Sequence, residues 1–257
     1  MSDAPIGVFD SGVGGVSVLR EIRALLPGEE LIYYADSAYC PYGGQPREAI
    51  QARACAITEL LLARGCKLIV VACNTATIAA VEHLRATYPV PFVGMEPAVK
   101  PAVAATRSGV VGVLATGAAL AGEKFHRLLA AHARDVRVIT RPCPGWVEQV
   151  EAGELDGVRT RALVERDVRP LLAENADVLV LGCTHYPFLR PIIQQIAGAD
   201  TRLIDTGAAV ARQVRRVLER EGLLARAANG RLQWLTSGDA AEVLGLCERL
   251  FAVGTTV

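Results

Sequence analysis

Two cysteines stand at equivalent points of two separate apolar segments of the chain. Cys73 closes the segment "LIVVAC", and Cys183 closes the segment "VLVLGC". A free thiol has a pKa of about 8.5, and its thiolate is the reactive form, which the N-terminus of a following helix favours. Two such acid/base groups on opposite sides of a small substrate can remove a proton from one face of a carbon and return one to the other. The pair therefore predicts proton transfer that inverts a stereocentre.

The residues around both thiols carry hydroxyl, amide and other polar groups. Such groups, together with the free N–H groups at helix starts, bind anions. Removing the α-proton of an amino acid places negative charge next to its carboxylate, which donors of this kind must hold. We therefore expect a carboxylate substrate, bound by Asp10, Ser11, Asn74, Thr75, Thr116, Thr184 and His185.

Asp10 and His185 are also titratable, so each could carry a proton to or from its neighbouring thiol. Each has a simpler interpretation, Asp10 as a helix N-cap and His185 as a supporting residue. Tyr42 and Gly43 belong to the segment "YCPYGGQP", which follows another strand. A turn is its default interpretation, although strand carboxyl ends are also where ligands bind, and we expect its Cys40 to be incidental.

Strand and helix patterns alternate along the whole chain, which indicates an α/β protein. Near-continuous apolar strands separated by helices are typical of doubly wound, mainly parallel sheets that bind ligands beyond the carboxyl ends of their strands. The expected strands cover residues 6–10, 31–36, 68–73, 91–95, 110–115, 136–140, 178–183, 201–205 and 232–236.

An internal repeat predicts two related α/β domains. "GVFDSG" resembles "GVLATG", and "LIVVACNT" resembles "VLVLGCTH", with the second copies roughly 105 and 110 positions later. We expect a discontinuous first domain of residues 1–97 plus 208–257 and a second domain of residues 98–207. The active site would then lie in the cleft between two pseudo-symmetric domains.

The composition excludes several classes of protein. The chain has 257 residues, 27 basic and 27 acidic side chains, so charge gives no argument for a nucleic acid or a membrane as partner. The N-terminal segment shows neither a secretory signal nor a membrane span. Seven cysteines without a C-x-x-C pair indicate neither a disulfide framework nor a zinc ribbon, and they fit a reducing cytoplasm.

Two cofactor-dependent reactions are alternatives to chemistry by the thiol pair. "GVGGVS" after the first strand, with Asp36 ending the next, resembles a dinucleotide loop, but Ser17 occupies the sixth position of the motif. Pyridoxal phosphate would need a Schiff-base lysine, and neither Lys67, Lys100 nor Lys124 lies at a strand carboxyl end. A reaction without cofactor or metal is the simplest interpretation.

The motifs together resemble the aspartate/glutamate racemase superfamily, and glutamate racemases in particular. The resemblance runs from Ile6 to about Gly238 through "GVFDSGVGGVSVLREI", "YYADSAYCPYG", "VVACNTATIAAVEHLR", "MEPAVKPA" and "VLGCTHYPFL". It implies cofactor-independent interconversion of L- and D-glutamate in the cytoplasm, supplying D-glutamate for peptidoglycan and hence for cell-wall biogenesis and cell shape. Members of this family are often dimers, in more than one arrangement, so a homodimer is one assembly that the resemblance allows, and the sequence itself does not give the oligomeric state.

The resemblance also implies roles for single residues. Cys73 resembles the base that acts on D-glutamate, assisted by Asp10, and Cys183 the base that acts on L-glutamate, assisted by His185. Glu151, in "CPGWVEQVEAG", matches a family acid near that histidine. The substrate would be lined by Asp10, Ser11, Tyr42, Gly43, Asn74, Thr75, Thr184 and His185.

One departure from the family pattern concerns substrate binding. The family usually reads A-T-x-G-T after the strand at 110–115, whereas this chain reads "ATGAAL", so Ala119 replaces the second threonine. A racemase or isomerase of the same superfamily acting on aspartate or another acid therefore stays open. Two other functions also stay open for this chain: a non-catalytic amino-acid sensor and a dinucleotide-dependent oxidoreductase.

Overall fold

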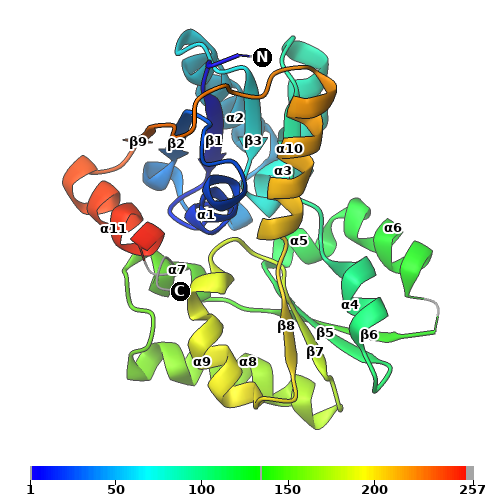
Figure 1. Cartoon of the computed structure of the whole chain (residues 1–257). Coiled ribbons are helices and arrows are strands. Elements are labelled where there is room, and N and C mark those ends of the chain that lie inside the picture. Colours follow the sequence, from blue (N-terminus) through cyan, green and yellow to red (C-terminus); the bar gives the residue numbers. More distant parts are fainter. Residues whose placement is uncertain (1, 134, 253–257) are drawn as a thin grey trace. The chain divides into compact units, whose positions relative to one another are not determined.

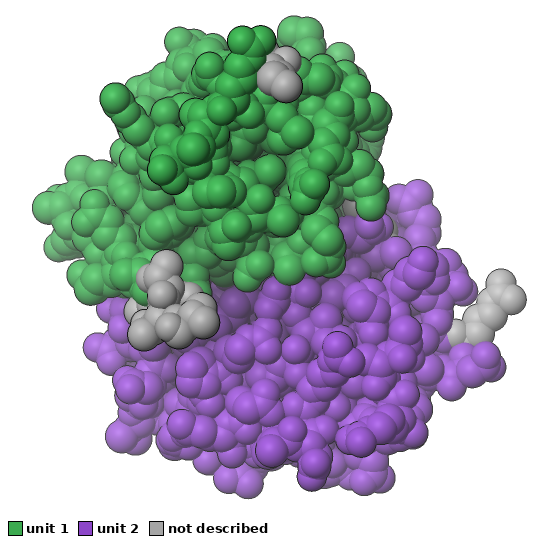
Figure 2. All heavy atoms as spheres, viewed as in Figure 1, with its two compact units in different colours: residues 1–95, 207–257 green, residues 96–206 purple. Residues whose placement is uncertain are grey.

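The computed structural model describes residues 2–133 and 135–252 of the chain, with the side chain of residue 124 left out. The chain divides into two compact units (Figure 2). Unit 1 consists of Met1–Met95 and Gly207–Val257, and unit 2 consists of Glu96–Thr206.

Unit 1 is built on a five-stranded sheet in which every adjacent pair is parallel. Its central strands are almost entirely apolar and fully buried, as expected when helices cover both faces of a parallel sheet. In spatial order the strands are β4 (Phe92–Gly94), β3 (Leu68–Val71), β1 (Ile6–Asp10), β2 (Leu31–Ala35) and β9 (Leu232–Thr236).

The helices of unit 1 form two groups (Figure 1). In the first group, α1 (Val16–Leu25) packs against α10 (Gly207–Arg220) and α11 (Ala240–Ala252). In the second, α2 (Arg47–Ala63) packs against α3 (Asn74–Thr87). The second pair shares one apolar cluster with alternate strand residues, because successive side chains of a strand point to opposite faces.

Unit 2 repeats this architecture with a four-stranded parallel sheet. In spatial order its strands are β6 (Arg137–Pro142), β5 (Val110–Ala115), β7 (Val178–Leu181) and β8 (Arg202–Ile204). Its helices are α4 (Val99–Ala105), α5 (Gly117–Ala121), α6 (Glu123–His132), α7 (Trp146–Glu151), α8 (Val158–Ala173) and α9 (Arg190–Ala197).

The predicted α/β class with parallel sheets is confirmed, and each expected strand is present. The order β4-β3-β1-β2 in unit 1 has the same pattern of crossovers as β8-β7-β5-β6 in unit 2. Two strands end two residues earlier than predicted, β3 at Val71 and β7 at Leu181. Cys73 and Cys183 therefore lie just beyond the strands, in the segments that leave the sheets.

Among residues 2–133 and 135–252, no helix combines the length and apolar character that crossing a bilayer requires.

Candidate active site

The two cysteines follow strands at the switch points of their sheets. In unit 1 the chain leaves β1 toward β2 on one side and leaves β3 toward β4 on the other. In unit 2 it leaves β5 toward β6 and β7 toward β8 in the same way. Open α/β sheets bind ligands at the carboxyl ends of the strands where the order reverses. Cys73 follows β3 at one such point, and Cys183 follows β7 at the other.

The sulfur of Cys73 lies among polar groups from two adjacent strand ends. Its Sγ is 3.7 Å from the hydroxyl of Ser11, and it accepts a hydrogen bond from the backbone N–H of Ala76 at 3.5 Å. Ser11 in turn donates its backbone N–H (2.6 Å) and its hydroxyl (3.2 Å) to Oδ1 of Asp10. Asp10 is the last residue of β1 and is fully buried, whereas Gly15 is the N-cap of α1. The alternative that Asp10 is a helix N-cap is therefore wrong.

The thiol of Cys73 caps the N-terminus of α3, as the sequence predicted. Burial nevertheless raises the pKa of Cys73 well above its usual value, and the negative charge of Asp10 raises it further. The hydrogen bond from Ala76 acts in the opposite direction without outweighing them. Cys73 thus holds its proton in the free protein, with a carboxylate beside it that can receive one.

Asn74 and Thr75 are the first residues of α3, and both are buried. The first N–H groups of a helix lack intrahelical partners and can bind an anion. Tyr42 and Gly43 lie in a short 3-10 helix, η2 (Tyr42–Gly44), in the segment between β2 and α2. The ring of Tyr42 belongs to the apolar cluster that contains Cys73, so the structure brings these two residues into the same part of unit 1.

The sulfur of Cys183 lies beside a histidine rather than a carboxylate. Its Sγ is 3.6 Å from Nδ1 of His185, and Nε2 of the same ring is 2.6 Å from Oε1 of Glu151. His185 is buried and Glu151 ends α7, so the helix positions the acid and the acid orients the ring. Gly182 allows β7 to approach β5 here, because a Cβ at this position would lie 2.9 Å from the side chain of Ala115.

An α-helix begins directly after Cys73 but not directly after Cys183. A turn and a 3-10 helix, η3 (Tyr186–Leu189), separate it from α9. Pro187 accounts for the difference, since it lacks the N–H that would bond to the carbonyl of Cys183 in an α-helix beginning directly after that residue. Thr184 lies in this turn and is buried.

Thr116 follows β5 at the switch point of unit 2 and caps α5, since its hydroxyl accepts the N–H of Ala119 at 3.3 Å. Ala119 is itself buried. The position that carries a threonine hydroxyl in the family pattern thus presents only a methyl group in this chain.

The features that resembled a dinucleotide site have other roles. Gly15 brings α1 close to the sheet: a Cβ there would lie 2.7 Å from Cβ of Asp10 and 2.9 Å from the hydroxyl of Tyr33. Asp36 is fully buried, and its carboxylate accepts hydrogen bonds from Arg53 and Tyr42. The sequence indicated no role for Arg53. A cation in a largely apolar helix was the only signal that could have pointed to it.

Lys67 is not placed to form a Schiff base with a cofactor near Cys73. It precedes β3, at the end of the strand opposite Cys73, and its Nζ is paired with Glu29 at 2.6 Å with both side chains buried.

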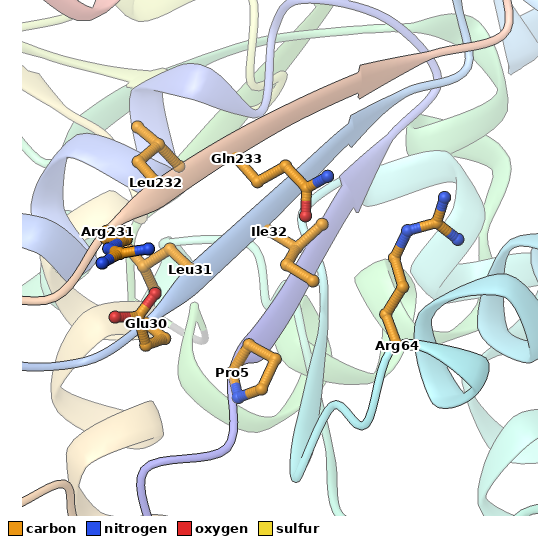
Figure 3. Close-up of a pocket in the computed structure, with 8 residues that line it drawn as sticks. All are labelled: Pro5, Glu30, Leu31, Ile32, Arg64, Arg231, Leu232 and Gln233. Atoms are coloured by element: carbon orange, nitrogen blue, oxygen red, sulfur yellow. The ribbon is translucent and has the colours of Figure 1, made fainter.

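A hollow of about 510 Å³ also lies at the amino-terminal ends of β1, β2 and β9, away from the switch point (Figure 3). Figure 3 shows Arg64 and Arg231 on opposite sides of it rather than converging on one point. Both side chains are exposed, and the floor is formed by apolar residues that include Ile32. The hollow therefore does not belong to the group of residues around Cys73.

Known proteins are similar to this chain over most of its length. A family model for Asp/Glu/hydantoin racemases matches residues 6–214. A glutamate racemase from Herpetosiphon aurantiacus is 58% identical over 242 residues, which are 94% of this chain and 95% of that protein.

Solved structures give the same result at lower sequence identity. A glutamate racemase isoform from Bacillus anthracis has a TM-score of 0.88 at 31% identity, covering 97% of this chain and 94% of that one. The Escherichia coli glutamate racemase, solved with L-glutamate and the activator UDP-MurNAc-ala, has a TM-score of 0.86 at 36% identity over 95% and 94% of the two chains. The resemblance predicted from the motifs is confirmed, and the chain is an enzyme of the aspartate/glutamate racemase family.

Proposed function

We propose that this protein interconverts L- and D-glutamate without a cofactor, using Cys73 and Cys183 as its two bases. One observation carries the proposal. Sheets of equivalent strand order each place a buried cysteine at the switch point, next to a second titratable group. The similarity to glutamate racemases over nearly the whole chain supports glutamate as the substrate.

In the D-to-L direction, the thiolate of Cys73 removes the α-proton of D-glutamate. The thiol of Cys183 then donates a proton to the opposite face of the α-carbon, which leaves Cys73 as a thiol and Cys183 as a thiolate. That state is the one required to act on L-glutamate, so the reverse reaction uses the same groups in reverse order. The N–H groups at the start of α3 and the nearby hydroxyl groups would hold the substrate carboxylate while negative charge develops.

Asp10 and His185 would exchange protons with the thiols between turnovers. A carboxylate at Glu151 accepts a hydrogen bond from Nε2–H, so that a neutral imidazole presents the lone pair of Nδ1 to Cys183. On the other side, Asp10 is the charged group that acts on Cys73. The two thiols would therefore be served by different proton acceptors.

The product supports a role in the cell wall. D-glutamate is a component of peptidoglycan, and the glutamate racemase family supplies it. We therefore propose that the protein serves peptidoglycan biosynthesis.

The test is a chiral assay of the purified protein on L- and D-glutamate with no added cofactor, in water and in deuterated water. Wild type should racemise both enantiomers and incorporate deuterium at the α-carbon. Cys73→Ser and Cys183→Ser should each abolish racemisation, whereas Cys55→Ser, a half-buried thiol on α2, should not. Normal racemisation by both active-site variants would refute the two-base mechanism. Binding without exchange of the α-hydrogen would instead identify a sensor.

A second candidate substrate follows from Ala119. Without the family threonine at this position, the site could accept aspartate or another acidic amino acid. Circular dichroism with a panel of acidic amino acids distinguishes the two, since a glutamate racemase acts faster on glutamate than on its shorter homologue.

A further inference from the structure

Asp36 is a fully buried carboxylate with a complete set of charged and polar partners. Arg53 donates to it through Nε (3.0 Å, to Oδ2) and Nη2 (2.6 Å, to Oδ1), and the hydroxyl of Tyr42 donates to Oδ2 at 2.5 Å. The backbone N–H of Asp36 donates to the carbonyl of Asp10 at 3.0 Å. The carboxylate therefore lies one strand away from the residues that surround Cys73.

An ion pair with one fully buried partner is weak evidence for stability, because the desolvation of that charge offsets much of the attraction. Its bidentate geometry, however, fixes the orientation of everything bonded to it. The group that it holds here is Tyr42, whose ring is buried in the same apolar cluster as Cys73. Burial raises the pKa of Tyr42, and the hydrogen bond to Asp36 raises it further, so the phenol stays a proton donor to the carboxylate.

Arg53 also holds the other part of the segment between β2 and α2. Its guanidinium carbon lies 3.9 Å from the ring centroid of Tyr39, a cation–π contact. The carbonyl of Tyr39 accepts the side-chain amide of Gln45 at 2.5 Å. One guanidinium thus joins the strand end, η1 (Ser37–Tyr39) and, through Asp36, η2.

We propose that Asp36 and Arg53 are positioning residues that hold Tyr42 and residues 37–45 in the conformation that binds the substrate. This inference rests on the proposed function, because residues 42 and 43 belong to the expected substrate lining. Neither Asp36 nor Arg53 needs to touch glutamate: they act through the segment that does. Their loss should therefore weaken substrate binding more than it slows the chemical step.

The test compares KM and kcat of Arg53→Met, Arg53→Lys and Tyr42→Phe with wild type. Arg53→Met should raise KM for both enantiomers by about tenfold or more while kcat changes much less, the pattern expected when uniform binding is lost. Because enantiomers have equal free energies, kcat/KM must fall equally in the two directions, which is an internal check. Arg53→Lys keeps the charge and should restore part of the loss, whereas Tyr42→Phe removes only the hydroxyl held by Asp36 and should reproduce part of it.

Lys67→Met is the control, since it breaks a different ion pair of unit 1, the buried pair with Glu29 at the opposite end of the strands. It should lower the melting temperature without raising KM. Wild-type KM in Arg53→Met and in Tyr42→Phe would overturn this inference while leaving the proposed function intact. Absence of racemisation by the wild-type protein would overturn the proposed function instead. If Arg53→Met does not fold, the lysine and phenylalanine variants decide the outcome.

Discussion

Cys73 and Cys183 follow corresponding strands, yet their sulfur atoms have different neighbours. Burial and the carboxylate of Asp10 favour the protonated form of Cys73, whereas the sulfur of Cys183 faces a ring nitrogen of His185. The same residue type is therefore set up in two different ways by the side chain beside it.

The first prediction concerns the charge of Asp10. Asp10→Asn removes a negative charge that raises the pKa of Cys73, so the pKa of the thiol should fall and more thiolate should be present at a given pH. Labelling of Cys73 by iodoacetamide near pH 8 should become faster, by up to about tenfold for each pKa unit. Peptide mass spectrometry measures the labelled fraction, and Cys66, where burial raises the pKa to about 12, serves as the internal reference. Unchanged or slower labelling of Cys73 in this variant would contradict the assignment.

The second prediction concerns Glu151. Glu151→Gln keeps the size of the side chain but replaces a charged acceptor at Nε2 of His185 with a neutral amide, which weakens the preference for one tautomer of the ring. Racemisation should fall by about a hundredfold, the lower range for loss of general acid–base assistance. Glu148→Gln lies on the same helix with an exposed side chain and should leave the rate unchanged. Equal rates in the two variants would show that the contact between Glu151 and His185 has no part in catalysis.

At the scale of secondary-structure elements, Asp177 connects the start of β7 to the loop before β5. Its carboxylate accepts the hydroxyl of Thr106 (2.5 Å), the N–H of Arg107 (2.7 Å), and the N–H and hydroxyl of Ser108 (3.0 and 2.9 Å). Partial burial disfavours ionisation, but these hydrogen bonds outweigh it and lower the pKa of Asp177 to about 2. The loop is therefore stabilised by the charged form of this residue.

The third prediction follows from the sign of that shift. A carboxyl group with a depressed folded-state pKa contributes stability that is complete above its unfolded pKa, near 3.8, and is lost as the pH falls through about 2. Asp177→Asn should lower the free energy of unfolding at pH 7 by about 2 kcal/mol. The difference from wild type should shrink progressively below pH 4 in denaturant titrations. Asp200→Asn, an exposed control in unit 2, should cost little at any pH, and a pH-independent loss in Asp177→Asn would refute the explanation.

Each expected strand was predictable because buried parallel strands are short apolar runs bounded by polar residues. The element after Cys183 was not predictable in the same way, because the same apolar pattern fits a helix or a turn. Pro187 favours the turn through its missing N–H group. The sequence offered Asp36 only as a match to the spacing of a ribose-binding acid, because its ion pair with Arg53 joins residues that only the folded chain brings together. The order of the strands, which places both cysteines at switch points, also depends on crossovers that no local pattern specifies.

At the scale of the whole molecule, unit 1 is assembled from both ends of the chain. Glu29 accepts the N–H of Ala225 at 2.8 Å and pairs with Lys67, whose Nζ also donates to the carbonyl of Ser2 at 2.5 Å. One buried ion pair therefore connects the N-terminal segment, the loop before β2, the start of β3 and the segment after α10.

The fourth prediction tests this connection. Lys67→Met leaves the carboxylate of Glu29 buried without its cation, which should cost about 3–5 kcal/mol of unfolding free energy. Replacing both residues, as Lys67→Met with Glu29→Leu, should recover much of the loss because no uncompensated charge remains. Arg215→Met breaks an exposed pair with Glu219 on α10 and should cost less than about 1 kcal/mol. Chemical denaturation compares the variants, and a double variant as unstable as the single one would show that the charge is not the cause.

The placement of β9 and α10 has a consequence for how the chain is made. Unit 2 is continuous, whereas the sheet of unit 1 receives its edge strand, and α1 its packing partner, only from residues after 206. On the ribosome, everything that unit 2 needs emerges before unit 1 can be completed, although residues 1–95 of unit 1 are synthesised before unit 2. Until residues after 206 emerge, the nascent segment 1–95 therefore leaves the apolar face of α1 and the edge of β2 uncovered. A ribosome stalled once residue 206 has left the exit tunnel, but before β9 has, should consequently display a protease-resistant unit 2 and a protease-sensitive segment 1–95.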